Sequence, residues 1–307
     1  MKIDDQIINW LKQLNTDKSH NWPDEVTNQA PHKPFLLLSV IDGFEQGWIA
    51  NNDIKLSPLL SETFYRYWDE IMGNRNTKIS TPFTHLDNEP FWTTNQKHAY
   101  LDERLFNLLK HGKKRDQVRS ILLGNYFNSE TAAKLIGIGE MSGDIWDGSK
   151  ELNELVLNDF VAIHSSEGKT ITSNTERQKR DKSFSLSIKN QYRYYCAVCR
   201  SKVITPGGKV IVDGAHIIPW EVSYNDDPRN GISLCKNHHW MFDEHLYTIR
   251  PDFSILISPI LTEKSQKIDI KSLADTKILL PDDKVFIPAE EALLYHNEKF
   301  EQLHVNI

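Results

Sequence analysis

Apolar side chains recur three or four residues apart through most of the first half of the chain. This spacing is typical of amphipathic helices, which turn one apolar face toward a core. The stretch 31–47 is apolar on nearly all sides after a proline-bounded turn, which predicts a largely buried helix ending at Gly47. The predicted helices of this half cover residues 1–20, 31–47, 56–73, 101–111, 115–126, 128–137 and 150–164.

Shorter patterns interrupt and then follow these helices. Residues 48–54 predict a short β-element, and the proline- and aromatic-rich stretch 78–93 predicts strand and loop. In the second half, the alternation over 246–258 predicts a β-hairpin and 289–301 a closing helix. The sequence therefore predicts an α+β protein whose helices are concentrated in the N-terminal half.

The distribution of charge separates the two halves. The net charge is −6, yet segment 169–210 holds ten lysines and arginines against two acids, a local net charge of +8. We therefore place a basic linker at 166–184, between an N-terminal domain at 1–165 and a C-terminal domain at 185–307. The basic segment predicts a surface for a phosphate backbone, but for 173–183 alone we favour a solvated linker.

The chain offers no pattern for membrane insertion. Its longest apolar run, 34–41, is far shorter than a bilayer span requires. The first ten residues, MKIDDQIINW, have acids where a secretory signal would carry positive charge. We expect a cytoplasmic protein without a membrane partner.

The three cysteines fall at the spacing of metal ligands. Cys196 and Cys199 form one x-x pair, and Cys235 and His238 form a second. Three thiolates and one imidazole are a typical closed set for structural zinc, and their use leaves no cysteine for a disulfide. Free buried thiols are the alternative interpretation.

A second set of polar residues accompanies this cluster. His238 and His239 lie about 100° apart around a helix axis, so one can bind zinc while the other faces a second site. His216 ends a strand-like run and Asn230 lies in a turn. A hairpin, a loop and a helix that carry these residues predict a ββα unit around a metal.

The strings CAVC, DGAHIIPW, DPRNGISLC and KNHHWMFDEH resemble the HNH endonucleases. The resemblance implies that His216 is the general base, Asn230 the middle asparagine and His239 a ligand of a catalytic Mg²⁺ or Mn²⁺. Many such proteins have an acid or a histidine just before the base; here that position is Ala215. Asp213, on the same strand face, is the candidate second ligand.

The residue types suit phosphodiester hydrolysis. An imidazole can take a proton from water near neutral pH, and a divalent ion neutralises charge on the phosphate and the leaving oxygen. A zinc-dependent protein that binds DNA without cutting it is the alternative.

The first half resembles a sulfur-binding domain of type IV restriction endonucleases that recognise phosphorothioate DNA, often joined to a C-terminal HNH domain. The resemblance lies in PHKP at 31–34, the apolar helix after it, and STPFTHL at 80–86 followed by PFW. That family usually has an aromatic residue where this chain has Thr81, and a small residue where it has His85. The DNA- and sulfur-binding residues that the resemblance implies are His32, Lys33, Thr81, Pro82 and His85, with Arg104 as a further candidate.

The alternatives for these residues are plain structural roles. Pro82 also suits a strand edge, while His32 and Lys33 suit a solvated helix start. A sulfur atom in the DNA backbone is larger and more weakly hydrated than oxygen, so an apolar cavity favours it and penalises an unpaired oxygen.

The sequence thus predicts a nuclease for phosphorothioate-modified double-stranded DNA. One HNH site cuts one strand, so we expect a homodimer or a DNA-induced dimer. A nuclease for methylated or hydroxymethylated DNA, reading a flipped base, is the main alternative.

Overall fold

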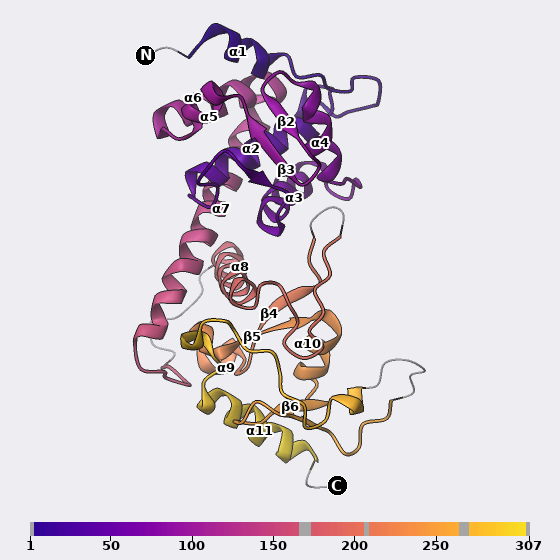
Figure 1. Cartoon of the computed structure of the whole chain (residues 1–307), viewed down its shortest axis with the longest axis vertical. Helices are drawn as coiled ribbons and strands as arrows, with labels where there is room; N and C mark the ends of the chain where they lie inside the picture. The colour runs from indigo at the N-terminus through magenta and orange to yellow at the C-terminus, as the bar shows by residue number, and fades with distance from the viewer. Residues whose placement is uncertain (1–2, 166–172, 206–208, 264–269, 305–307) are drawn as a thin grey trace. The chain divides into compact units, whose positions relative to one another are not determined.

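The computed structural model describes residues 3–165, 173–205, 209–263 and 270–304 (Figure 1). The chain divides into two compact units, one made of Met1–Asp144 with Ile204–Lys209, the other of Ile145–Val203 with Val210–Ile307. The division falls within a long helix, α7 (Ser129–Glu154), whereas the sequence predicted a boundary at 165. None of the described helices is long and apolar enough to cross a membrane.

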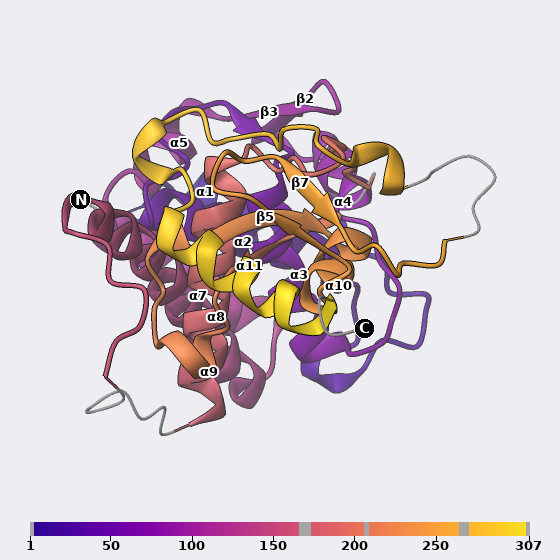
Figure 2. The same cartoon turned by 90° about the horizontal axis from the view of Figure 1, so that it is seen from below.

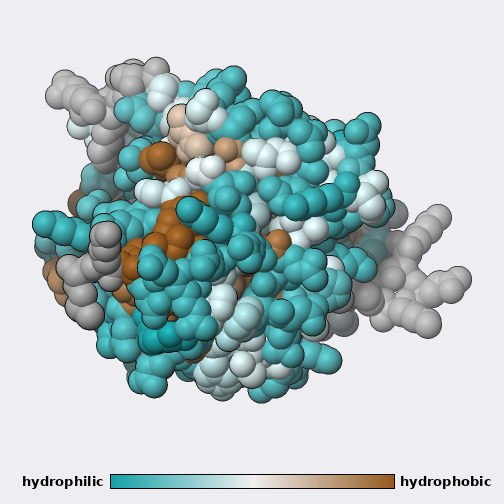
Figure 3. All heavy atoms as spheres, turned by 90° about the horizontal axis from the view of Figure 1, so that it is seen from above, coloured by the Kyte–Doolittle hydropathy of each residue, from teal (hydrophilic) through white to brown (hydrophobic). Residues whose placement is uncertain are grey.

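The first unit is built around α2 (His32–Glu45), which is buried from Lys33 to Phe44. A proline occupies its N-cap and another its third position, where a missing N–H costs nothing. The other helices of this unit are α1 (Asp5–Lys12), α3 (Pro58–Met72), α4 (Ser80–His85), α5 (Glu103–Leu109) and α6 (Gly112–Tyr126). Of these, α3, α4, α5 and α6 contact α2 directly. The face in Figure 3 is mostly hydrophilic, with hydrophobic residues showing in narrow patches.

A small antiparallel sheet completes this unit. Its order is β1 (Ile54–Lys55), β3 (His98–Leu101), β2 (Trp92–Thr94). The prediction of strand and loop over 78–93 is wrong for its first part, because residues Ser80–His85 form α4. Pro82 lies in the first turn of that helix, where proline is tolerated. The Trp92 indole donates to the Phe83 carbonyl at 3.1 Å and so ties α4 to β2.

The second unit has a ββα arrangement at its centre. β4 (Val212–His216) pairs antiparallel with β5 (Gly231–Cys235), and α10 (Lys236–Asp243) follows at once. A short helix, α9 (Trp220–Ser223), and a 3-10 turn, η4 (Pro228–Asn230), lie in the β4–β5 connection. A second hairpin, β6 (Tyr247–Ile249) with β7 (Ile255–Ile257), follows, and α11 (Glu290–His304) packs on β6 (Figure 1). Figure 2 shows α11 and β7 from below.

The hairpin β4–β5 is covered by α8 (Asn174–Gln191). A Cβ added at Gly214 would lie 2.8 Å from the Ser185 Cα, so glycine permits this close approach. The structure therefore places 174–184 in a packed helix rather than in the predicted linker, and 166–172 lie outside the described residues. Phe184 and Ile188 are buried, but they stand among many charged residues in the sequence. The apolar face of this helix was therefore not evident from the hydrophobic pattern.

Candidate functional site

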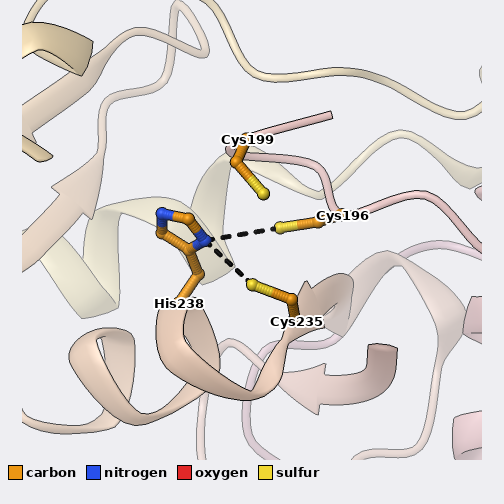
Figure 4. Close-up of side chains that lie close together, drawn as sticks. All are labelled: Cys196, Cys199, Cys235 and His238. Atoms are coloured by element: carbon orange, nitrogen blue, oxygen red, sulfur yellow. Dashed lines mark hydrogen bonds between the residues drawn. The ribbon is translucent and has the colours of Figure 1, made fainter. Parts of the chain in front are cut away.

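The four predicted zinc ligands meet at one point in the second unit (Figure 4). The ligand atoms of Cys196, Cys199, Cys235 and His238 all lie within 4.8 Å of one another. His238 Nδ1 is 3.0 Å from Cys235 Sγ and 3.7 Å from Cys196 Sγ. A tetrahedral zinc ion with bonds of about 2.3 Å separates its ligand atoms by roughly 3.8 Å, so the group fits zinc.

Backbone bonds hold this group together. The Ala197 N–H donates to the Ser233 carbonyl at 2.7 Å, which fixes the Cys196 turn on β5. Cys235 is the N-cap of α10, and the Tyr247 hydroxyl donates to the His238 carbonyl at 3.0 Å. Burial lowers the pKa of His238, but hydrogen bonds with the Cys199 and Cys235 sulfurs outweigh it and raise that pKa to about 9. A zinc ion would bind this imidazole in its neutral form, so metal binding would release the proton that the neighbouring sulfurs stabilise on His238.

His216 lies at the end of β4 and faces α8. Its ring stacks on Phe184 with a centroid separation of 3.6 Å and an interplanar angle of 4°. Its Nε2 is 3.0 Å from an oxygen of Asp226. The other oxygen of Asp226 accepts from the Trp220 indole at 3.1 Å. No motif or periodicity in the sequence marks Asp226.

Asn230 is completely buried and binds backbone only. Its Oδ1 accepts from the Ile218 N–H at 2.9 Å, and its Nδ2 donates to the carbonyls of Ile218 and Asn225, each at 3.1 Å. The amide therefore joins the segment after β4 to the segment before β5. It therefore fixes the loop that carries Asp226, the residue that contacts His216.

The candidate ligands of a catalytic cation lie between β4 and α10. His239 Nδ1 is 3.9 Å from the Asp213 carboxylate, and its Nε2 is 3.6 Å from the Asp243 carboxylate. Lys236 also pairs with Asp213. Burial raises the pKa of Asp213, but hydrogen bonds from His239 and Lys236 outweigh it and lower that pKa to about 2. Asp243 was not among the predicted ligands, although its spacing of four residues from His239 on a helix is a usable signal.

The base and the cation ligands occupy opposite faces of the hairpin. Side chains alternate along β4, so Asp213 and Ala215 face α10 while Gly214 and His216 face α8. The structure brings Asp213 and His239 together, but in its described part no hydrogen bond joins His216 to either. Three residues of strand, about 10 Å, separate the Cα atoms of Asp213 and His216.

Five of the six residues predicted to bind modified DNA line one cavity in the first unit. This cavity has a volume of about 210 Å³. Its lining residues are Asn15, Thr16, Asp17, Trp22, Ala30, His32, Lys33, Thr81, Pro82 and His85. Arg104 is not among them, because it pairs with Asp4 and Asp102 and covers the Trp10 ring. The segment before α2 contributes Trp22 and Asp17, which no motif in the sequence had singled out.

The wall of this cavity has little free positive charge. Lys33 was expected to face the DNA backbone, but its ammonium pairs with the buried Glu89. Burial lowers the pKa of His32 to about 4, so that its imidazole is neutral near pH 7. The His32 ring packs against Trp68 with a centroid separation of 4.5 Å and against Trp22 with one of 5.5 Å. The carbon atoms of Trp22, Ala30 and Pro82 complete an apolar wall.

Comparison with known proteins identifies one segment. Residues 196–250 match the family model described as HNH endonuclease. Among curated proteins none matches the sequence. A solved structure, described as the modification-dependent TagI restriction endonuclease, is similar with 19% identity and a TM-score of 0.29. That match covers 38% of this chain and 36% of the other, so the chain spans about a third of that protein's length.

Proposed function

We propose that this protein, a metal-dependent DNA endonuclease with an HNH domain, cuts double-stranded DNA that carries phosphorothioate in its backbone. The observation that supports the proposal most is the cavity around Pro82. Trp22, Ala30 and Pro82 offer carbon surface there, and neither the neutral His32 nor the paired Lys33 offers a free cation. Such a wall desolvates sulfur at low cost and leaves a phosphate oxygen without a partner.

The rim of the same cavity supplies polar groups for the rest of the phosphate. Thr81 and His85 are exposed on α4, next to the buried Pro82. Their donors suit the remaining oxygens of a phosphorothioate and the edges of adjacent bases. The cavity thus combines an apolar floor with a polar rim.

In the nuclease half, His216 takes a proton from water, and Asn230 fixes the loop beside it. Asp213, His239 and Asp243 offer the carboxylate and imidazole ligands that Mg²⁺ or Mn²⁺ accepts. Such an ion neutralises charge on the phosphate and the leaving oxygen when it is bound. Because His216 lies on the other face of the hairpin, about 10 Å along the strand from Asp213, the proposal requires the scissile phosphate to lie across the end of β4, between the base and the ion. A zinc ion in the Cys196 group stabilises the fold of this unit.

One active site cuts one strand, so a double-strand break requires two copies of the chain. We place them in a homodimer, either preformed or assembled on DNA. Mass photometry with and without duplex is expected to show a dimeric mass on DNA. A monomeric mass together with nicking alone contradicts this part of the proposal.

Binding tests the recognition step separately from cleavage. Gel shifts with duplexes of one sequence, either unmodified, methylated, hydroxymethylated or phosphorothioate-modified, are expected to favour the last by at least about 10-fold. Pro82→Ser introduces a hydroxyl at the wall and is expected to reduce that preference, while Pro90→Ser, at an exposed proline, serves as the matched control. Equal affinity for all four duplexes contradicts the proposal, and preference for a modified base favours the flipped-base alternative.

A further inference from the structure

Asp226 uses both of its carboxylate oxygens within the nuclease unit. The residue lies in the loop between α9 and η4, and its side chain is 15% exposed. One oxygen is 3.0 Å from His216 Nε2, and the other accepts from the Trp220 indole at 3.1 Å. The Trp220 indole therefore orients the carboxylate, and the other carboxylate oxygen faces His216.

Two aromatic stacks fix the remaining freedom of this arrangement. The Arg180 guanidinium lies 3.6 Å from the centroid of the Trp220 ring, which holds the indole that orients Asp226. Phe184 stacks on the His216 ring and fixes its plane. Both Arg180 and Phe184 belong to α8, so the helix controls the geometry on each side of Asp226.

We infer that Asp226 is the positioning residue of the general base and that Nδ1 of His216 is the nitrogen that accepts the proton. A carboxylate accepts a hydrogen bond, so the Nε2 that faces it carries the hydrogen of the neutral ring. Within the described residues, Nδ1 of His216 has no hydrogen-bond partner. The inference rests on the proposed nuclease function and specifies the atom through which His216 acts.

With His216 as the base, water, the phosphodiester and solvent protons account for every bond that changes in the hydrolysis. A water oxygen forms a bond to phosphorus, the bond from phosphorus to the 3′-oxygen breaks, and a water proton moves to Nδ1. The leaving 3′-oxygen takes a proton from solvent, and the imidazolium later releases its proton to solvent. The Asp226 carboxylate accepts the hydrogen bond from Nε2 and stabilises the imidazolium that forms, as an orienting carboxylate does in other base dyads.

The charged surroundings of His216 give this carboxylate a distinct effect. The described contacts bring two charged groups toward the ring, Asp226 directly and Arg180 through Trp220. The adjacent Asp227 is already paired with Arg229 at 2.7 Å. Removing the Asp226 charge leaves the imidazolium that forms during catalysis less stable, so kcat is expected to fall.

Asp226→Asn tests the inference with little change of shape. An amide has one acceptor oxygen, so it can serve His216 or Trp220 but not both. We expect kcat on a duplex that the wild type cuts to fall about 10- to 100-fold with KM nearly unchanged. Asp226→Glu is expected to recover part of that loss. Glu221→Gln, an exposed acid on α9 that pairs with Arg177 at 3.0 Å, is the matched control.

Two readouts separate positioning from other roles. Mn²⁺ affinity, measured by electron paramagnetic resonance, is expected to be the same in wild type and Asp226→Asn; its loss would make Asp226 a metal ligand and overturn the inference. An unchanged kcat, or a rise in KM alone, also overturns it.

A third readout does not depend on cleavage. Nitrogen-15 NMR of histidine-labelled protein is expected to show the Nε2–H tautomer for His216 in the wild type. The Nδ1–H tautomer would refute the inference even if the protein cut no tested DNA. Absence of cleavage by the wild type, with the expected tautomer present, would instead refute the proposed function.

Discussion

Asn230→Asp is expected to loosen the β4–β5 connection, although it only replaces the NH2 group of the side chain with an oxygen. The native amide accepts one hydrogen bond and donates two, all to buried backbone of Ile218 and Asn225. A carboxylate keeps the bond from the Ile218 N–H but cannot donate to the two carbonyls. The Ile218 carbonyl keeps a hydrogen bond from the Ser223 hydroxyl at 3.3 Å, so only the Asn225 carbonyl loses its described partner. An unpaired buried carbonyl costs about 1–3 kcal/mol, before any cost of burying charge.

Hydrogen exchange measured by mass spectrometry suits this prediction, because a chain with two units need not unfold in one step. Peptides from 212–235 are expected to exchange at least about 5-fold faster in Asn230→Asp, as a loss of about 1 kcal/mol requires. Asn237→Asp makes the same change at an exposed position of α10 and is expected to leave exchange in β5 unchanged. Equal protection in wild type and Asn230→Asp would refute the assignment of Asn230 as the residue that fixes this loop.

Three further changes test other parts of the structure. Cys235→Ser is expected to lower bound zinc from about one ion per chain to nearly none and to destabilise the second unit by several kcal/mol, measured by elemental analysis and calorimetry. Burial holds the pKa of His32 near 4 in the folded state, whereas in the unfolded state it is about 6.5. As the pH falls the unfolded state therefore binds this proton first, and the free energy of unfolding drops between about pH 6.5 and pH 4 by up to about 3 kcal/mol. His32→Gln is expected to remove that drop from denaturation curves. Gly231→Ala would place its Cβ 2.7 Å from the Ile188 Cγ1 and is expected to cost about 1–3 kcal/mol, whereas Gly124→Ala, with open space around it, is expected to stabilise its helix.

Local spacing was sufficient to predict the Cys196 group and much of the cavity around Pro82. Each x-x pair places two ligands on one short segment, and the bond from the Ala197 N–H to the Ser233 carbonyl helps bring the two pairs together. PHKP and STPF were enough to bring His32 and Pro82 to one cavity. These features depend on short stretches of backbone, which sequence motifs describe well.

The features that the sequence did not reveal depend on distant partners. Lys33 pairs with Glu89, 56 residues away, so its charge is not available as the motif suggested. Trp22 reaches the cavity from an irregular segment that has no periodicity. The segment predicted as a basic linker forms part of α8, whose Phe184 packs on His216. In each case tertiary contacts, rather than local pattern, decide what the residue does.

The central claim joins an apolar recognition cavity to a hydrolytic HNH site in one enzyme. The most direct measurement is the rate of strand cleavage of two otherwise identical duplexes, with and without one phosphorothioate, in Mg²⁺ or Mn²⁺. We expect wild type to cleave the phosphorothioate duplex and to cleave the normal one little. His216→Ala is expected to cleave neither, while it still binds. Cleavage of both duplexes at one rate, or full activity of His216→Ala, would contradict it.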